Sequence, residues 1–144
     1  MDKRIVESAQ KSCRIGSTNT TVGLDLQILD TFACRLARKH IARQLVEADH
    51  HVLQTEERLI LSVKDKLLNM THGLIASGRS AKSVALAVYW RVVQMAKEHI
   101  MEIGVEEDML VEAMNSIQIE TNSTLTSLLG VETLNQLYCE ENLS

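Results

Sequence analysis

Apolar residues recur along this chain with the period of an α-helix. The 49 residues from Leu24 to His72 contain neither Gly nor Pro. Leu29, Ala33 and Leu36 are spaced as one face of a helix. A second set repeats at heptad spacing and resembles a coiled-coil seam: Leu53, Ile60, Val63, Leu67, Met70 and Leu74. These patterns predict one unusually long helical tract over about residues 24–76.

The tract is interpreted as one continuous or merely kinked helix, with a break near residues 47–51 as the alternative. Residues 24–61 lack the Gly, Pro, Asn and Ser that tight turns between helices usually contain. A break is favoured by Thr55, which could cap a new helix with acidic residues in its first turn. A continuous helix would be about 75 Å long. It would need another chain to bury its apolar face, so we expect an oligomer.

Glycines delimit the next predicted helix. Gly78 is a stop signal and Ser80 a cap for a helix over residues 81–103, which Gly104 ends. That helix is apolar on almost every side, with a narrow polar stripe made by Arg91, Gln94, Glu98 and Glu102. Such a helix is typical of a protein centre or an oligomer interface.

Weaker patterns precede and follow these elements. Residues 2–15 could form a short amphipathic helix. Acidic residues at 106–108 suit the start of a short helix that ends near Ile117. Residues 115–127 are polar and weakly patterned, and a last helix is expected over about 125–138.

The composition favours an all-α fold of four to six helices in a bundle. Proline is absent from the 144 residues, and glycine occurs six times. Only four residues are aromatic, so the core must be aliphatic. The length predicts a single helical domain over residues 1–144.

Cysteine content and hydropathy bear on the compartment. Three widely spaced cysteines, Cys13, Cys34 and Cys139, argue against a disulfide framework or a zinc site. The longest apolar run, residues 84–90, is far shorter than a membrane span. We expect a cytoplasmic protein that does not enter membranes.

Charge is distributed very unevenly along the chain. All fifteen Lys and Arg residues lie within residues 1–97, together with nine acidic residues, which gives 15 − 9 = +6. Residues 98–144 contain ten acidic residues and no Lys or Arg, hence −10. This division into a basic body and an acidic C-terminal part predicts a protein partner bound through the acidic C-terminal part, or attraction between the two parts within or between chains.

Four cations share one face of the predicted long helix: Arg35, Arg38, Lys39 and Arg43. Arg79 and Lys82 could extend this patch. Such a patch could bind the phosphates of a nucleic acid, or it could bind the chain's own acidic part. His40 lies on the apolar face, which favours a hydrogen-bonded core or interface residue.

Catalytic and metal-binding signals are weak. Glu47 and His50 have the Glu-x-x-His spacing of carboxylate-bridged di-iron bundles, but the second copy that such a site requires is missing. Cys34 stands beside Arg35 and Arg38, although its apolar neighbours favour simple packing. No nucleotide-binding, hydrolase or zinc-protease motif occurs. We therefore expect no catalytic residue, bound metal or cofactor.

Together these patterns predict a non-enzymatic, cytoplasmic interaction or regulatory protein that acts as a homo-oligomer. Its interface is expected at the heptad seam and at Val88 and Trp90 of the apolar helix. A nucleic-acid-binding module that uses the basic face is the alternative. A metal-binding helical bundle is a remote one.

Overall fold

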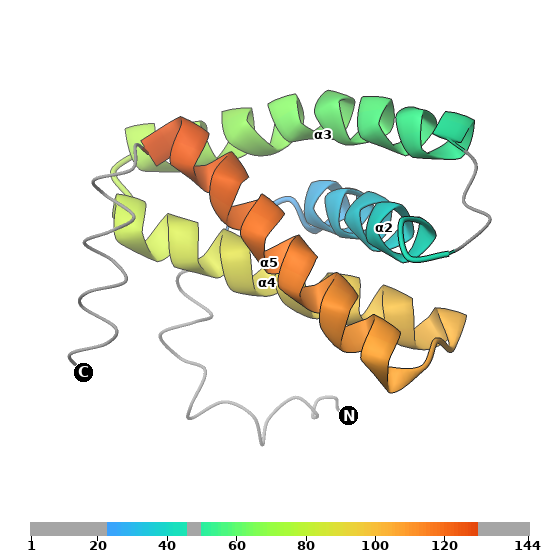
Figure 1. Ribbon diagram of the computed structural model, residues 1–144. Coiled ribbons are helices and arrows are strands. Elements are labelled where there is room, and N and C mark those ends of the chain that lie inside the picture. The colour runs from blue at the N-terminus through green and yellow to red at the C-terminus, as the bar shows by residue number, and fades with distance from the viewer. Residues whose placement is uncertain (1–22, 46–49, 130–144) are drawn as a thin grey trace, which may run out of the picture.

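The computed structural model describes residues 23–45 and 50–129, and all regular secondary structure in them is α-helical (Figure 1). The helices are α2 (Leu26–Ala42), α3 (His50–Ala76), α4 (Ala81–Ile103) and α5 (Glu107–Leu129). This confirms the all-α bundle. None of these four helices is long and apolar enough to span a membrane. The expected helices at 2–15 and after Gly130 lie outside the described residues.

Helix α2 is the centre of the bundle. In Figure 1, α3 and α4 lie on either side of it, and α5 crosses in front. The start of α2 meets the end of α3, because the backbone N–H of Asp25 lies 3.0 Å from Sδ of Met70. The two helices are therefore antiparallel neighbours.

The interpretation of residues 24–76 as one continuous helix is wrong. α2 ends at Ala42, and the next residues form a turn in which Gln44 and Leu45 donate backbone bonds of 3.0 and 3.2 Å three residues back. This tightened last turn ends the helix without a glycine. The physical reason is burial: two antiparallel helices can pack their apolar faces on each other, which one straight helix cannot do.

The helix boundaries predicted around α4 are confirmed. Gly78 has a φ of 106°, and the backbone N–H groups of Gly78 and Arg79 bond to the carbonyls of Ile75 and Leu74, a Schellman motif that ends α3. Ser80 accepts a bond from the backbone N–H of Ser83 and caps α4. Gly104, at φ 82°, ends α4 in the left-handed conformation.

Helix α5 is longer than predicted, since it continues through the polar residues 118–127. Its hydroxyl side chains cause little disruption because they bond inside the helix. Thr121 and Thr124 donate to the carbonyls of Ile117 and Glu120, four residues earlier, at 2.8 and 3.1 Å. With their hydroxyls bonded in this way, both threonines are buried.

The four helices share one core, which is aliphatic apart from Phe32. Most of the predicted heptad seam belongs to it. Ile60 and Leu67 are buried in the core, while Val63, Met70 and Leu74 pack against it. Val88 is buried there as well. The seam therefore packs within one chain, because its apolar side chains are covered by the chain's own helices.

Candidate functional site

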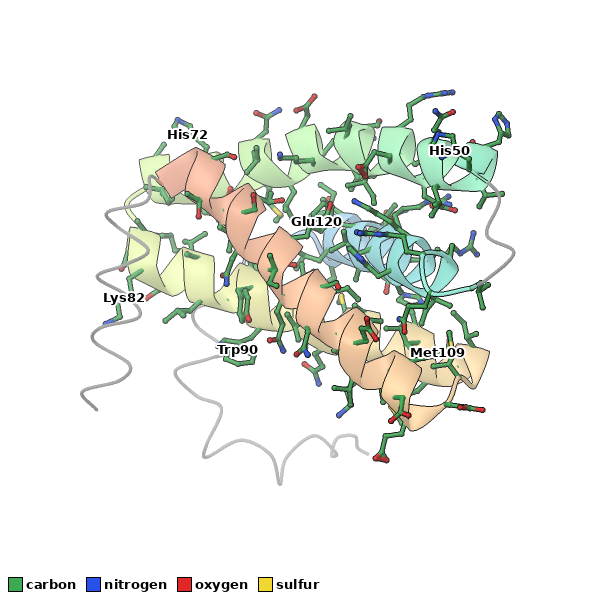
Figure 2. All side chains as sticks on the ribbon, viewed as in Figure 1. His50, His72, Lys82, Trp90, Met109 and Glu120 are labelled. Carbon is green, nitrogen blue, oxygen red and sulfur yellow. The ribbon has the colours of Figure 1, made fainter. Side chains whose placement is uncertain are left out.

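A cluster of charged residues joins three helices near the end of α2. Nζ of Lys39 lies 2.6 Å from Oε1 of Glu57 on α3 and 3.1 Å from both carboxylate oxygens of Glu120 on α5. Nε2 of His40 lies 2.7 Å from Oε1 of Glu120. Figure 2 shows Glu120 between α2 and α5. The cluster therefore links α2 to α3 and, through His40 and Glu120, 80 positions apart in the sequence, to α5.

The local sequence explains this placement. Lys39 and His40 are adjacent, so their side chains diverge by about 100° around α2. His40 is turned into the core and is 5% exposed, whereas Lys39 lies at the edge between α3 and α5. The interpretation of His40 as a hydrogen-bonded core residue is confirmed.

The pKa of Glu120 is set by opposing effects. Partial burial raises the pKa of this carboxyl, because a charged group is less well solvated there. Hydrogen bonds from His40 and Lys39, and the charges on those groups, lower it by more. The pKa of Glu120 therefore lies below its ordinary value of 4.5, and the group is ionised at neutral pH.

Half of the cations on the basic face of α2 are bound by the chain's own carboxylates. Arg35 lies 3.3 Å from Oε1 of Glu56 on α3, and Lys39 is bound as described above. Within the described residues, Arg38 and Arg43 have no ion-pair partner and are exposed. Two of the four predicted phosphate-binding cations thus stabilise the bundle itself.

The six predicted cations also do not form one patch. The side chain of Arg79 approaches Gly23, at the opposite end of α2 from Arg43. Figure 2 shows Lys82 at one end of the bundle and His50 at the other. His50 and Arg43 line the same shallow groove. The structure therefore separates Arg79 and Lys82 from the α2 cations.

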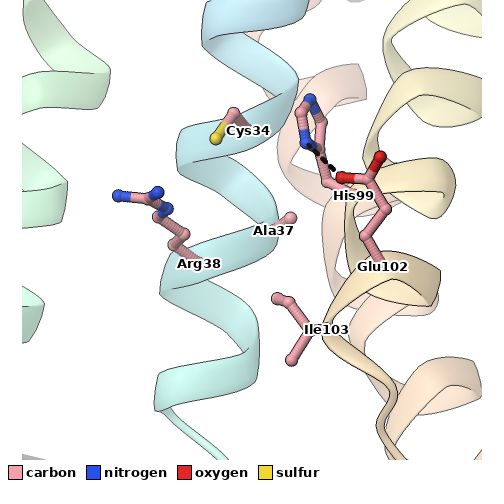
Figure 3. Close-up of a pocket in the computed structure, with 6 residues that line it drawn as sticks. All are labelled: Cys34, Ala37, Arg38, His99, Glu102 and Ile103. Carbon is pink, nitrogen blue, oxygen red and sulfur yellow. Dashed lines mark ion pairs between the residues drawn. The ribbon is translucent and has the colours of Figure 1, made fainter.

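A small pocket of about 160 Å³ lies between α2 and α4 (Figure 3). Its lining comprises Cys34, Ala37, Arg38, His99, Glu102 and Ile103. Nε2 of His99 lies 2.9 Å from Oδ1 of Asp30, and Nδ1 lies 3.9 Å from Oε1 of Glu102. Arg38 points to the other side of α2 from His99 in this view. Both imidazole nitrogens thus face carboxylates, an arrangement that joins α2 to α4.

The metal hypothesis gains no support from the described residues. No three His, Cys, Asp or Glu side chains among them are grouped so that they could hold a metal ion. His50 is exposed and bonds to Gln54 at 3.2 Å. Glu47, the other candidate ligand, lies outside the described residues.

The outer side of α4 carries large apolar side chains that are exposed to solvent. Trp90 is 55% exposed and Met101 is 61% exposed. Figure 2 shows Trp90 directed away from the bundle. The ring of Tyr89 contacts Trp90 edge to face, with centroids 5.0 Å apart. Of the eight predicted interface residues, Trp90 is the one that the structure leaves largely uncovered, while Leu53 is half-buried.

Sequence reasoning missed the acidic partners in these clusters. Glu120 stands in a polar stretch without clear periodicity, and Asp30 is one of several acidic residues on the predicted long helix, with nothing to single it out. The excess of acid after residue 97 was the available signal for Glu120. It could not indicate which carboxylate would meet Lys39 and His40.

Searches of protein families, curated proteins and solved structures found no match to this chain. Its function must therefore be inferred from its own geometry.

Proposed function

We propose that this protein is a non-enzymatic interaction or regulatory protein that acts in the cytoplasm as a homo-oligomer. One observation carries the proposal: Trp90, the chain's single tryptophan, is more than half exposed on a helix whose opposite face forms the core. Tryptophan is enriched among the residues that contribute most to protein interfaces. Met101, three helical turns further along the same side of α4, is exposed as well, and exposed apolar surface of this kind is typical of a contact surface.

Burial in the core leaves fewer of the predicted interface residues accessible to a second copy. Leu67 and Val88 are 0% exposed in the single chain, so they are not accessible to a second copy. The outer side of α4 is what remains of the predicted interface. We therefore assign the contact to this surface and not to the heptad seam.

The proposal is tested by the mass of the protein in solution. Light scattering at low salt and at about 0.5 M salt should give a multiple of the 16.1 kDa chain mass. Trp90→Ser should lower the mass towards that of one chain. Ile119→Ser is the matched control, because Ile119 is 70% exposed on α5. A native chain that stays monomeric at micromolar concentrations would contradict the proposal.

Nucleic-acid binding receives less support from the geometry. Glu56, Glu57 and Glu120 already bind two of the α2 cations. A contact through the remaining Arg38 and Arg43 would be weak, and its salt dependence would be shallow, because only two phosphates would be neutralised. Loss of such binding in an Arg38→Glu/Arg43→Glu variant would be the evidence in its favour.

A further inference from the structure

The outer side of α4 has the spacing of a second heptad seam. Six residues on this side follow one another at alternating intervals of four and three: Ser83, Ala87, Trp90, Gln94, Lys97 and Met101. All six are exposed or half-buried. The other side of the same helix, with Val88, Val92 and Ala96, is fully buried in the core. The outer seam, as we call these six residues, is half apolar, through Ala87, Trp90 and Met101, and no described helix packs on it.

We propose that a second copy of the chain covers the outer seam with its own α4, antiparallel, about a two-fold axis level with residues 95 and 96. This inference rests on the proposed function and names its interface. In this register Trp90 lies opposite Met101 of the second copy, and the symmetry produces the contact twice. Tryptophan and methionine pack favourably, because the thioether is polarisable and contacts aromatic rings well. Gln94 lies opposite Lys97 of the second copy and can accept a bond from its ammonium group.

Charges beside the seam favour the same arrangement. Arg91 flanks Trp90, and its Nε is buried without a hydrogen-bond partner among the described residues. Glu98, on the same flank, is exposed and has no ion-pair partner among them. Residues on this flank face their own counterparts in an antiparallel helix pair. Arg91 of each copy therefore comes near Glu98 of the other, which gives two symmetry-related ion pairs.

The register is specified by the large residues. A shift by one heptad would remove Trp90 from Met101 and place it opposite Gln94 or beyond the seam. It would also separate Arg91 from Glu98. Lys97 weakens the seam, because a charged residue is costly there, but polar residues at such positions are known to fix register. The Trp90–Met101 contact and the Arg91–Glu98 pair thus favour the same register.

Charge reversal tests the pairing. Arg91→Glu and Glu98→Arg should each place like charges together and raise the dissociation constant of the dimer by about 10-fold or more. The double variant, Arg91→Glu/Glu98→Arg, should restore the native dimer mass, because the pair re-forms with opposite signs. Glu112→Arg, the same charge change at an exposed site on α5, is the control and should leave the mass unchanged.

Trp90 provides an independent readout, since it is the single tryptophan of the chain. Its emission should shift to shorter wavelength as protein concentration rises through the dissociation constant. Met101→Asp should abolish that shift without touching Arg91. This variant keeps the test decisive if Arg91→Glu fails to fold.

The outcomes separate the two proposals. A native chain that is monomeric overturns both the α4 pairing and the homo-oligomer. An oligomer whose mass ignores Glu98→Arg and Met101→Asp, with Trp90 still emitting as a water-exposed indole, overturns the α4 pairing alone. Loss of the dimer in the single charge variants and recovery in the double variant establish it.

Discussion

Nε2 of His40 lies 2.7 Å from Oε1 of Glu120, which ties the central helix α2 to the last described helix α5. The two residues are 80 positions apart and come from the basic and acidic parts of the chain. The basic and acidic parts of the chain are therefore in contact within the molecule. The described acidic end is not simply a solvated surface, because one of its carboxylates holds the bundle together.

Replacing Glu120 should destabilise the protein. Glu120→Gln keeps the size of the side chain but removes the charge that His40 and Lys39 bind. Hydrogen bonds to charged groups contribute about 1.5–3 kcal/mol each, and Lys39 keeps its contact with Glu57. We expect a loss of about 1–3 kcal/mol in the free energy of unfolding, measured by urea titration. Glu112→Gln, at an exposed site on the same helix, should change it by less than about 0.5 kcal/mol.

Stability should fall in acid because of the same carboxylate. The pKa of Glu120 in the folded protein lies below its ordinary value of 4.5, so the unfolded chain binds a proton more readily. The stabilisation is therefore complete above that ordinary value and is lost as pH falls through the lower, folded pKa. Urea midpoints measured from about pH 6 to about pH 3 should decrease, and less steeply in Glu120→Gln. Identical slopes in the two proteins would show that other carboxyls cause the loss.

Two glycines should respond oppositely to replacement by alanine. Gly23 has a φ of 92°, and an added Cβ would lie 2.9 Å from Cδ2 of Leu74. Gly23→Ala should therefore cost about 1–2 kcal/mol or more. Gly73 lies inside α3, and an added Cβ there would meet nothing within 4 Å. Gly73→Ala should stabilise the protein by about 0.5–1 kcal/mol. Thermal unfolding of both variants tests the difference, and a stabilised Gly23→Ala would contradict the packing at the start of α2.

Truncation within the heptad seam should lower stability without changing mass. Leu67 is buried in the core of one chain, so Leu67→Ala should cost about 2–5 kcal/mol. Leu61, which is exposed on the same helix, is the control, and Leu61→Ala should have little effect on the free energy of unfolding. Both variants should keep the native mass in light scattering. A change of mass in Leu67→Ala alone would indicate that the seam does pair between chains.

The heptad seam shows how far sequence reasoning reached. Its period correctly identified Ile60 and Leu67 as buried, because that depends only on which side of a helix they occupy. The period did not identify its partner, which in the single chain is the chain's own helices. An apolar stripe is buried equally well by another part of the same chain or by a second chain, and the period does not distinguish the two.

The turn after Ala42 and the length of α5 show where local signals failed. α2 ends in a turn with backbone hydrogen bonds between residues three apart. This turn contains no glycine or proline, so the sequence carried no signal for it. In α5, Thr121 and Thr124 usually favour turns, but their hydroxyls bond within the helix and their side chains are buried. In both places packing against the other helices outweighed local preference.

By itself the sequence determined the all-α class, the helix ends at Gly78, Ser80 and Gly104, and the division of charge. Each of these depends on neighbouring residues or on composition. The tertiary structure alone decided that α2 and α3 bury each other's apolar faces, that Glu120 meets His40, and that Trp90 stays exposed. These contacts join residues far apart in the chain, and only the packing of whole helices brings them together.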